Sequence, residues 1–174
     1  MGKRELFARS LDAHLSGPLR AVVVELGSGS RPFYRPDHTY ICVDSRRSDS
    51  PNLLIASAEN LPLRSSIADV VVGFQVLCSV RDVASTITEI RRVTKPGGVY
   101  LGVEHVRNPN PLLRVVQRFR THFRGTRGRC RLGLDVPTLL LEAGFDVHVQ
   151  RFPRAFSPYV QFTADPCERA HEPT

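Results

Sequence analysis

The sequence contains no tryptophan, one methionine and only two lysines, Lys3 and Lys95, among 24 basic residues. Its formal net charge of +7 is therefore carried almost entirely by arginine. Arginine binds anions and planar groups through a forked guanidinium, but a preference for arginine over lysine can also reflect genome composition alone. The charge leaves both readings open.

Paired cysteines and long apolar runs are also missing. The four cysteines lie far apart, with no Cys-x-x-Cys pair and no histidine at metal-ligand spacing, so we expect reduced thiols and no metal site. No run approaches the roughly 20 apolar residues that a membrane span needs, and early charges interrupt any secretory core. The sequence predicts a cytoplasmic protein without a transmembrane segment.

Short apolar runs bounded by turn residues dominate the rest of the chain. Seven of them are expected to be strands: 21–26, 39–43, 53–56, 69–74, 99–103, 147–152 and 159–163. Helices are expected at 6–15, 81–94, 112–123 and 136–143. Continuous apolar strands alternating with helices predict an α/β fold with a doubly wound, mostly parallel, Rossmann-like sheet and an antiparallel last strand.

The 174 residues suit one domain, with a helical flank over residues 1–19. Two connections are too rich in proline or polar residues for full helices: 30–38 contains Pro32 and Pro36, and 45–52 is polar with Pro51. We therefore expect shortened early helices that leave apolar sheet surface uncovered. Such a surface favours a homodimer.

The most informative segment is the end of the first expected strand, where Glu25 precedes Gly27, Ser28 and Gly29. The two glycines allow a sharp bend and close approach of a ligand to the main chain, and Glu25 supplies a fixed negative charge. Tight turns at strand ends use the same residues. This pattern alone is therefore a weak signal of a cofactor loop.

The dinucleotide fingerprint is broken at Pro32, because a helix whose N-terminus holds a pyrophosphate cannot follow the glycines. A cofactor without phosphate does not need that helix, and S-adenosyl-L-methionine is such a molecule. Asp44 closes the second expected strand, where a carboxylate can accept both ribose hydroxyls. Taken alone, Asp44 could equally be a turn residue or a helix cap.

Five motifs then follow in order: ELGSG, CVD, ASAENLPL, ADVVVGFQVL and EIRRVTKPGG. Over about residues 20–105 this order resembles class I S-adenosylmethionine-dependent methyltransferases of the methyltransferase type 11 group. VLCSV at 76–80 and VEHV at 103–106 resemble the branch that contains small alkyl-thiol methyltransferases.

The resemblance implies a residue set for the cofactor. Glu25 and the Gly27-Ser28-Gly29 turn would hold the methionine portion, and Asp44 the ribose. Ser57, Ala58 and Glu59 would form the adenine side, with the Ala58 backbone amide at the adenine edge. Gln75 would lie beside the methyl group. Ser57 stands where many relatives have aspartate, and Arg31 where many have a third glycine.

His105, at the end of the fifth expected strand, is the candidate catalytic base, because histidine accepts a proton near neutral pH. The alternative is that Glu104 and His105 form a hydrogen-bonded pair that fixes the following loop. Cys78 is read as a buried structural thiol rather than a reactive one.

The segment 107–135 is basic, and the resemblance places it on the substrate side. Its arginines accompany an apolar stripe of Leu112, Val115, Val116, Phe119 and Phe123. Three interpretations stay open: a solvated helix face over that stripe, a surface for an acidic substrate or a peripheral membrane contact, and a nucleic-acid surface.

Three functions are carried forward. The first is a methyltransferase for a small-molecule acceptor, such as a thiol or another lipophilic nucleophile. The second is an arginine-rich nucleic-acid methyltransferase or binder, against which the absence of an Asn/Asp-Pro-Pro-Tyr/Phe motif argues. The third is a non-catalytic cofactor-binding partner subunit.

Overall fold

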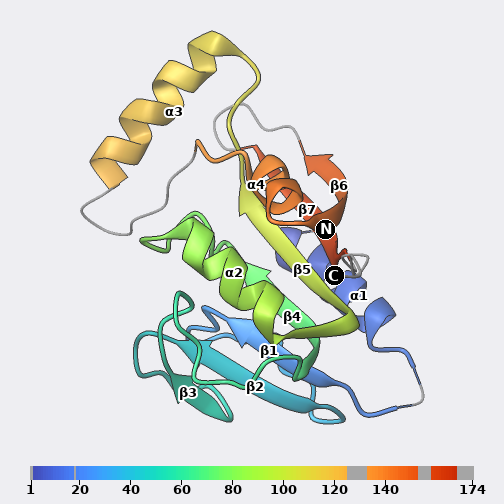
Figure 1. The fold of residues 1–174 in the computed structure, drawn as a ribbon. Coiled ribbons are helices and arrows are strands. Elements are labelled where there is room, and N and C mark those ends of the chain that lie inside the picture. The colour runs from blue at the N-terminus through green and yellow to red at the C-terminus, as the bar shows by residue number, and fades with distance from the viewer. Residues whose placement is uncertain (1, 18, 125–132, 153–157, 168–174) are drawn as a thin grey trace.

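The computed structural model describes residues 2–17, 19–124, 133–152 and 158–167. The described strands form one seven-stranded sheet in the order β3-β2-β1-β4-β5-β7-β6 (Figure 1). The strands are β1 Val22–Leu26, β2 Thr39–Asp44, β3 Leu53–Ile55, β4 Ala68–Phe74, β5 Thr94–His105, β6 Phe145–Phe152 and β7 Tyr159–Pro166. The helices are α1 Lys3–His14, α2 Val83–Val93, α3 Pro111–Arg124 and α4 Val136–Glu142.

The sheet is parallel from β3 to β5 and mixed beyond it. Strand β1 pairs in parallel with β2 and β4, and β4 pairs in parallel with β5. Strand β7 runs antiparallel to both β5 and β6. The doubly wound, mostly parallel architecture and the antiparallel strand at the end of the chain are therefore confirmed.

Helices cover the two faces of the sheet unequally. Figure 1 shows α2 and α4 in front of the sheet and α1 behind it. On the α2 side, one hydrophobic cluster contains Ile87, Ile90 and Leu140 from the helices together with Val24 and Val71 from the strands. On the α1 side, the core includes Phe7, Leu11, Phe33 and Tyr40, together with the opposite faces of the same strands. Successive side chains of a strand point to opposite faces of the sheet, so each strand contributes residues to both cores.

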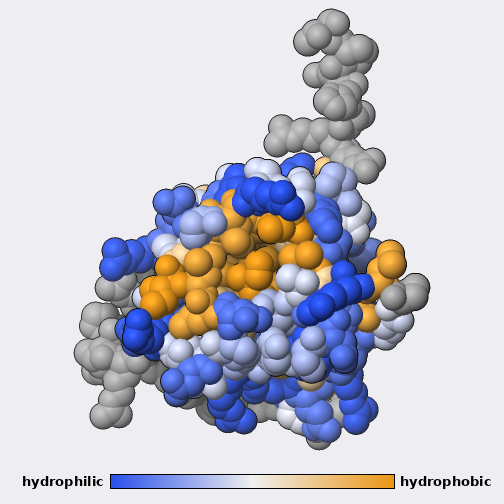
Figure 2. All heavy atoms as spheres, turned by 90° about the horizontal axis from the view of Figure 1, so that it is seen from below, coloured by the Kyte–Doolittle hydropathy of each residue, from blue (hydrophilic) through white to orange (hydrophobic). Residues whose placement is uncertain are grey.

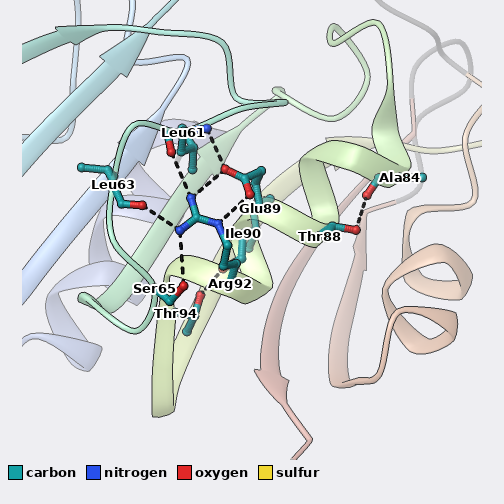
Figure 3. A network of polar contacts seen from close by, with 9 residues as sticks. All are labelled: Leu61, Leu63, Ser65, Ala84, Thr88, Glu89, Ile90, Arg92 and Thr94. Atoms are coloured by element: carbon teal, nitrogen blue, oxygen red, sulfur yellow. Dashed lines mark hydrogen bonds and ion pairs between the residues drawn. The ribbon is translucent and has the colours of Figure 1, made fainter.

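The first three connections of the sheet contain no helix, and all of their residues are among those that the structure describes. The prolines of 30–38 and the polar residues of 45–52 predicted this for the first two connections, whereas no such prediction was made for the third. The connection between β3 and β4 is held instead by polar contacts with side chains of α2 (Figure 3). Arg92 donates hydrogen bonds to the carbonyl oxygens of Leu61 and Leu63 at 2.9 and 2.7 Å, and Glu89 accepts the Leu61 amide at 2.7 Å. An ion pair of 2.7 Å between Arg92 and Glu89 joins these contacts.

An apolar area lies at the β2 and β3 side of the molecule. Figure 2 views the protein from that side and shows a continuous hydrophobic area surrounded by polar residues. At this edge Ile41 and Leu54 are only partly buried, and Ile55 is 53% exposed. The thin connections thus leave sheet surface uncovered, and the homodimer stays a prediction.

Helix α3 follows β5 and stands away from the sheet in Figure 1. Asp82 caps the start of α2, and its side chain accepts the Ser85 amide at 3.1 Å. Within the described ranges, no helix is both long enough and apolar enough to cross a membrane.

Candidate functional site

The carboxyl ends of β1, β2, β4 and β5 meet at one edge of the sheet. In open α/β sheets, ligands bind in the crevice outside these strand ends. The structure brings Glu25, Asp44, Gln75 and His105 to this edge, each at or just after the end of its strand. Residues from motifs that are separated along the sequence therefore lie along one edge of the sheet, which we call the rim.

A bend that requires glycine follows β1. Gly27 and Gly29 have φ angles of +62° and +55°, a region that other residues rarely adopt. A Cβ atom on Gly27 would lie 2.9 Å from Cγ2 of Val76, so close packing adds to the backbone requirement. The buried Ser28 between them donates its amide to Val43 at 3.2 Å. The bend thus presents main chain at the rim.

Glu25 lies beneath this bend and is 2% exposed. Its Oε2 atom accepts the Phe33 amide at 2.8 Å and the Tyr40 hydroxyl at 2.7 Å. Burial raises the pKa of the Glu25 carboxyl to about 7, and the two hydrogen bonds oppose that rise. A cation placed next to Glu25 would lower its pKa again and would be held by it.

Asp44 connects the end of β2 to the same bend. Its Oδ2 accepts the Gly29 amide at 2.9 Å, and its Oδ1 accepts the Arg46 amide at 2.9 Å. Each carboxylate oxygen has a second acceptor position, so both can still receive hydroxyl donors. The expected adjacency of Asp44 and the glycine bend is thus present in the structure.

The segment after β3 is organised around Glu59. The Ser57 hydroxyl donates to Oε2 of Glu59 at 3.0 Å, while Oε1 accepts the amides of Arg81 and Asp82 at 2.6 and 2.9 Å. The Asp82 hydrogen bond is the main cause that lowers the pKa of Glu59. Glu59 therefore links this segment to the start of α2, and Ala58 is partly buried beside it.

Gln75, His105 and Cys78 lie together after β4 and β5. Gln75 has a φ of +63°, an uncommon conformation for a residue other than glycine, and such strain concentrates at functional sites. Its Nε2 lies 3.2 Å from Nε2 of His105, and Nδ1 of His105 lies 3.9 Å from Sγ of Cys78. With the Gln75 amide as donor, Nε2 of His105 is the acceptor and Nδ1 carries the proton.

Glu104 holds the turn on which Gln75 and Cys78 sit, a role that sequence reasoning missed. Its carboxylate is fully buried and accepts the amides of Val76 and Leu77 at 2.7 Å and of Cys78 at 3.2 Å. Burial raises the pKa of Glu104 well above its ordinary value. Glu104 thus fixes the turn after β4. The alternative prediction was that Glu104 and His105 form a hydrogen-bonded pair that fixes the loop after β5.

Arg4 is a second residue that sequence reasoning missed. Its guanidinium lies 4.1 Å from the ring centre of Phe33 and 5.1 Å from that of Phe74, and it donates a hydrogen bond to the Arg31 carbonyl. Helix α1 therefore brings a cation to the loop that follows the glycine bend. Only the amphipathic pattern of the N-terminus pointed to this helix, and nothing in the spacing singled out Arg4.

The basic segment 107–135 contains α3, and its residues Arg127, Arg129 and Arg131 lie outside the described residues. The apolar stripe of α3 is not covered by the described residues: Leu112 is 78% exposed and Phe119 62%. The interpretation as a solvated helix face over this apolar stripe needs the stripe to be covered, yet Leu112, Val115, Val116 and Phe119 are exposed in the structure. The side chain of Phe123 lies outside the described residues.

Comparison with known proteins gives a consistent picture. A methyltransferase domain model matches residues 35–102. Thiol S-methyltransferase TMT1B of Rattus norvegicus is 35% identical over 127 residues, which are 62% of this chain and 51% of the relative. Thiol S-methyltransferase TMT1A of Homo sapiens is 32% identical over 122 residues, 60% of this chain and 50% of the relative. The chain spans about half the length of the curated relatives it matches.

Solved structures share the fold at low identity. The YcgJ protein of Bacillus subtilis superposes with a TM-score of 0.74 at 14% identity, covering 95% of this chain and 100% of that one. The 1,6-didemethyltoxoflavin-N1-methyltransferase of Burkholderia thailandensis, solved with S-adenosylhomocysteine, gives a TM-score of 0.67 at 18% identity, covering 94% and 77%. These comparisons confirm the resemblance to class I S-adenosylmethionine-dependent methyltransferases. Among these, the chain resembles the thiol-methylating branch.

Proposed function

We propose that this chain is an S-adenosylmethionine-dependent methyltransferase that acts on a small-molecule acceptor, with an aliphatic thiol as the preferred class. The observation that carries the proposal is the continuous rim formed by Glu25, the glycine bend, Asp44 and Gln75 at the carboxyl edge of the sheet. The choice of a thiol rests on the names of the curated relatives, which are thiol S-methyltransferases.

The residues of the rim fit this cofactor in charge and shape. The buried Glu25, with its raised pKa, gains from a nearby cation such as an ammonium or sulfonium group. The glycine bend offers main-chain groups without side chains, and Asp44 retains acceptor positions for two hydroxyls. No helix follows the bend before β2, so a pyrophosphate would lack the amide groups and dipole that hold it in dinucleotide sites.

Arg4 and Glu104 are two further residues to which we assign roles in the proposed cofactor site. We assign Arg4 to the carboxylate of the methionine portion, because it is the cation that α1 carries to the loop after the glycine bend. Glu104 is a positioning residue: its three hydrogen bonds hold the turn that carries Gln75 in its uncommon conformation. Glu59 and Ser57 stay predicted members of the adenine side.

When bound, S-adenosylmethionine supplies an electrophilic methyl group. The protein's contribution is alignment of the acceptor and exclusion of water, which can be worth roughly 7 to 11 kcal/mol. His105 has one ring nitrogen that accepts from Gln75 and is 9% exposed, so it can take the proton of an acceptor that replaces the Gln75 contact. A thiol with a pKa of about 8.5 is partly ionised near neutral pH and is strongly nucleophilic as the thiolate, whereas a phenol with a pKa of about 10, or an alcohol, depends more on such a base.

The activity is tested by measuring S-adenosylhomocysteine formation with separate aliphatic thiols, phenols and amines. We expect thiols to react fastest. In His105→Ala, we expect the thiol rate to fall by less than about tenfold and the phenol rate by about a hundredfold, because general-base catalysis contributes on that scale. His148→Ala is the matched control, since His148 is exposed on β6, and its rates should be unchanged.

Turnover of amines or phenols without thiol turnover would contradict the proposed acceptor. S-adenosylhomocysteine binding without turnover on any acceptor would favour the non-catalytic cofactor-binding subunit. Nucleic-acid binding that weakens steeply with salt would favour the nucleic-acid function. The cytoplasmic location stays a prediction.

A further inference from the structure

Helix α3 is attached to the protein along one side. Gln117 is buried and donates from Nε2 to the Val106 carbonyl at 2.8 Å, while its Oε1 accepts the Asn108 amide at 2.9 Å. Arg114 donates to the Asn108 carbonyl at 3.3 Å. These contacts fix the helix to the loop after β5, and the rest of α3 projects away from the sheet (Figure 1).

The outward side of α3 is apolar. Leu112, Val115, Val116 and Phe119 are 78, 52, 40 and 62% exposed, and together they make up most of the large exposed hydrophobic residues of the described chain. Their spacing of three and four residues puts them on one face of the helix. Four such side chains on one face are not the scattered exposure that is normal for a protein surface. This apolar face of α3 is therefore typical of a surface that binds an apolar partner.

The charge of α3 indicates which partner. The helix contains Arg114, Arg118, Arg120 and Arg124 and no acidic residue. The chain as a whole has a net charge of +7. Two copies of this arginine-rich helix, neither of which contains an acidic residue, repel each other by their charge, which disfavours a dimer through α3. An anionic membrane surface offers both an apolar interior for the exposed face and negative headgroups for the arginines.

We propose that α3 binds the surface of an anionic phospholipid membrane, with Leu112, Val115, Val116 and Phe119 inserted at the boundary between headgroups and acyl chains. The helix would lie in the plane of the interface, as amphipathic helices with basic residues do. The proposal concerns binding alone and does not depend on methyl transfer.

The test is sedimentation of the full chain with vesicles of phosphatidylcholine mixed with phosphatidylserine, compared with vesicles of phosphatidylcholine alone. We expect binding to the mixed vesicles, weaker binding at high salt, and little binding to phosphatidylcholine. The double variant Leu112→Ser/Phe119→Ser should bind the mixed vesicles at least about tenfold more weakly, because two apolar side chains no longer leave water.

Leu141→Ser is the matched control, since Leu141 is a leucine on α4 with 55% exposure. It should bind like the unchanged chain, and circular dichroism should show all variants folded. The proposal is overturned if the chain does not bind the mixed vesicles, or if the double variant binds as well as Leu141→Ser. It is also overturned if the unchanged chain self-associates in solution and the double variant does not, because α3 would then be a dimer contact.

Discussion

Glu25 illustrates how one residue combines structural and functional demands. Its carboxylate closes the loop after the glycine bend through Phe33 and Tyr40, yet it is almost completely buried. Two neutral donors do not replace the hydration that an ionised carboxylate loses, so burial raises the pKa of Glu25 to about 7. The pattern of an acid before two glycines predicted its location but not its buried hydrogen bonds.

The raised pKa of Glu25 leads to a stability prediction with a definite sign. Below about pH 4.5 the carboxyl is protonated in both folded and unfolded chains. Between about pH 4.5 and 7 the unfolded chain ionises first, so the free energy of unfolding falls as pH rises, by about 3 kcal/mol in total. Above pH 7 this contribution is constant.

Urea unfolding of the intact chain and of Glu25→Gln across that pH range measures this effect. The variant should lose most of the fall, because glutamine does not ionise. Glu104 is present in both proteins, so the difference between their pH profiles isolates Glu25. Identical pH profiles for the two proteins would show that Glu25 ionises normally in the folded state.

Other site residues differ in how far the sequence revealed them. Gly27, Gly29 and Asp44 belong to short patterns whose physical requirements are local: a left-handed bend and a carboxylate at a strand end. Arg4 and Glu104 act on loops far from them in the sequence, through contacts that exist only after the sheet forms. No spacing pattern in the sequence links such residues to the loops that they contact. Their roles could therefore not be predicted from the sequence.

At the scale of elements, the connection between β3 and β4 depends on α2. Figure 3 shows Arg92 reaching the carbonyl groups of Leu61 and Leu63 while Glu89 accepts the Leu61 amide. The helical spacing of 81–94 predicted α2 and its apolar face. It did not predict that the polar side of the same helix would hold a connection that has no helix of its own.

Replacing Arg92 with alanine should therefore destabilise the protein by about 1–3 kcal/mol, since two backbone carbonyl groups and Glu89 lose a charged donor. Thr88→Ala on the same helix is the control: its hydroxyl contacts only the Ala84 carbonyl one turn earlier, and its loss should cost less than about 0.5 kcal/mol. Thermal unfolding of the two variants compares them. Equal melting temperatures would mean that the connection is held by other contacts.

For the whole molecule, the alternation of strands and helices predicted most of the architecture. The seven expected strands and four expected helices are all present, with ends that shift by a few residues, as in α1, which begins at Lys3 rather than Leu6. The prolines of 30–38 and the polar residues of 45–52 correctly predicted missing helices. The order of the strands in the sheet was not predicted, because pairing between distant strands is not encoded in local periodicity.

Unequal coverage of the sheet also belongs to this scale. The apolar area at the β2 and β3 side in Figure 2 and the exposed face of α3 lie on different elements. They therefore need not share a partner. The first is compatible with the predicted homodimer, and the second carries the charge that favours an anionic membrane.

The central claim is that the rim at the carboxyl edge of the sheet holds S-adenosylmethionine. Calorimetric titration of the intact chain with S-adenosylhomocysteine tests it most directly, with Asp44→Asn, Arg4→Ala and Arg9→Ala as variants. Binding should be about tenfold to a hundredfold weaker in Asp44→Asn and Arg4→Ala, because each loses hydrogen bonds to a charged group. It should be unchanged in Arg9→Ala, whose side chain is exposed on α1. No binding by the intact chain, or equal binding by Asp44→Asn, would contradict the account.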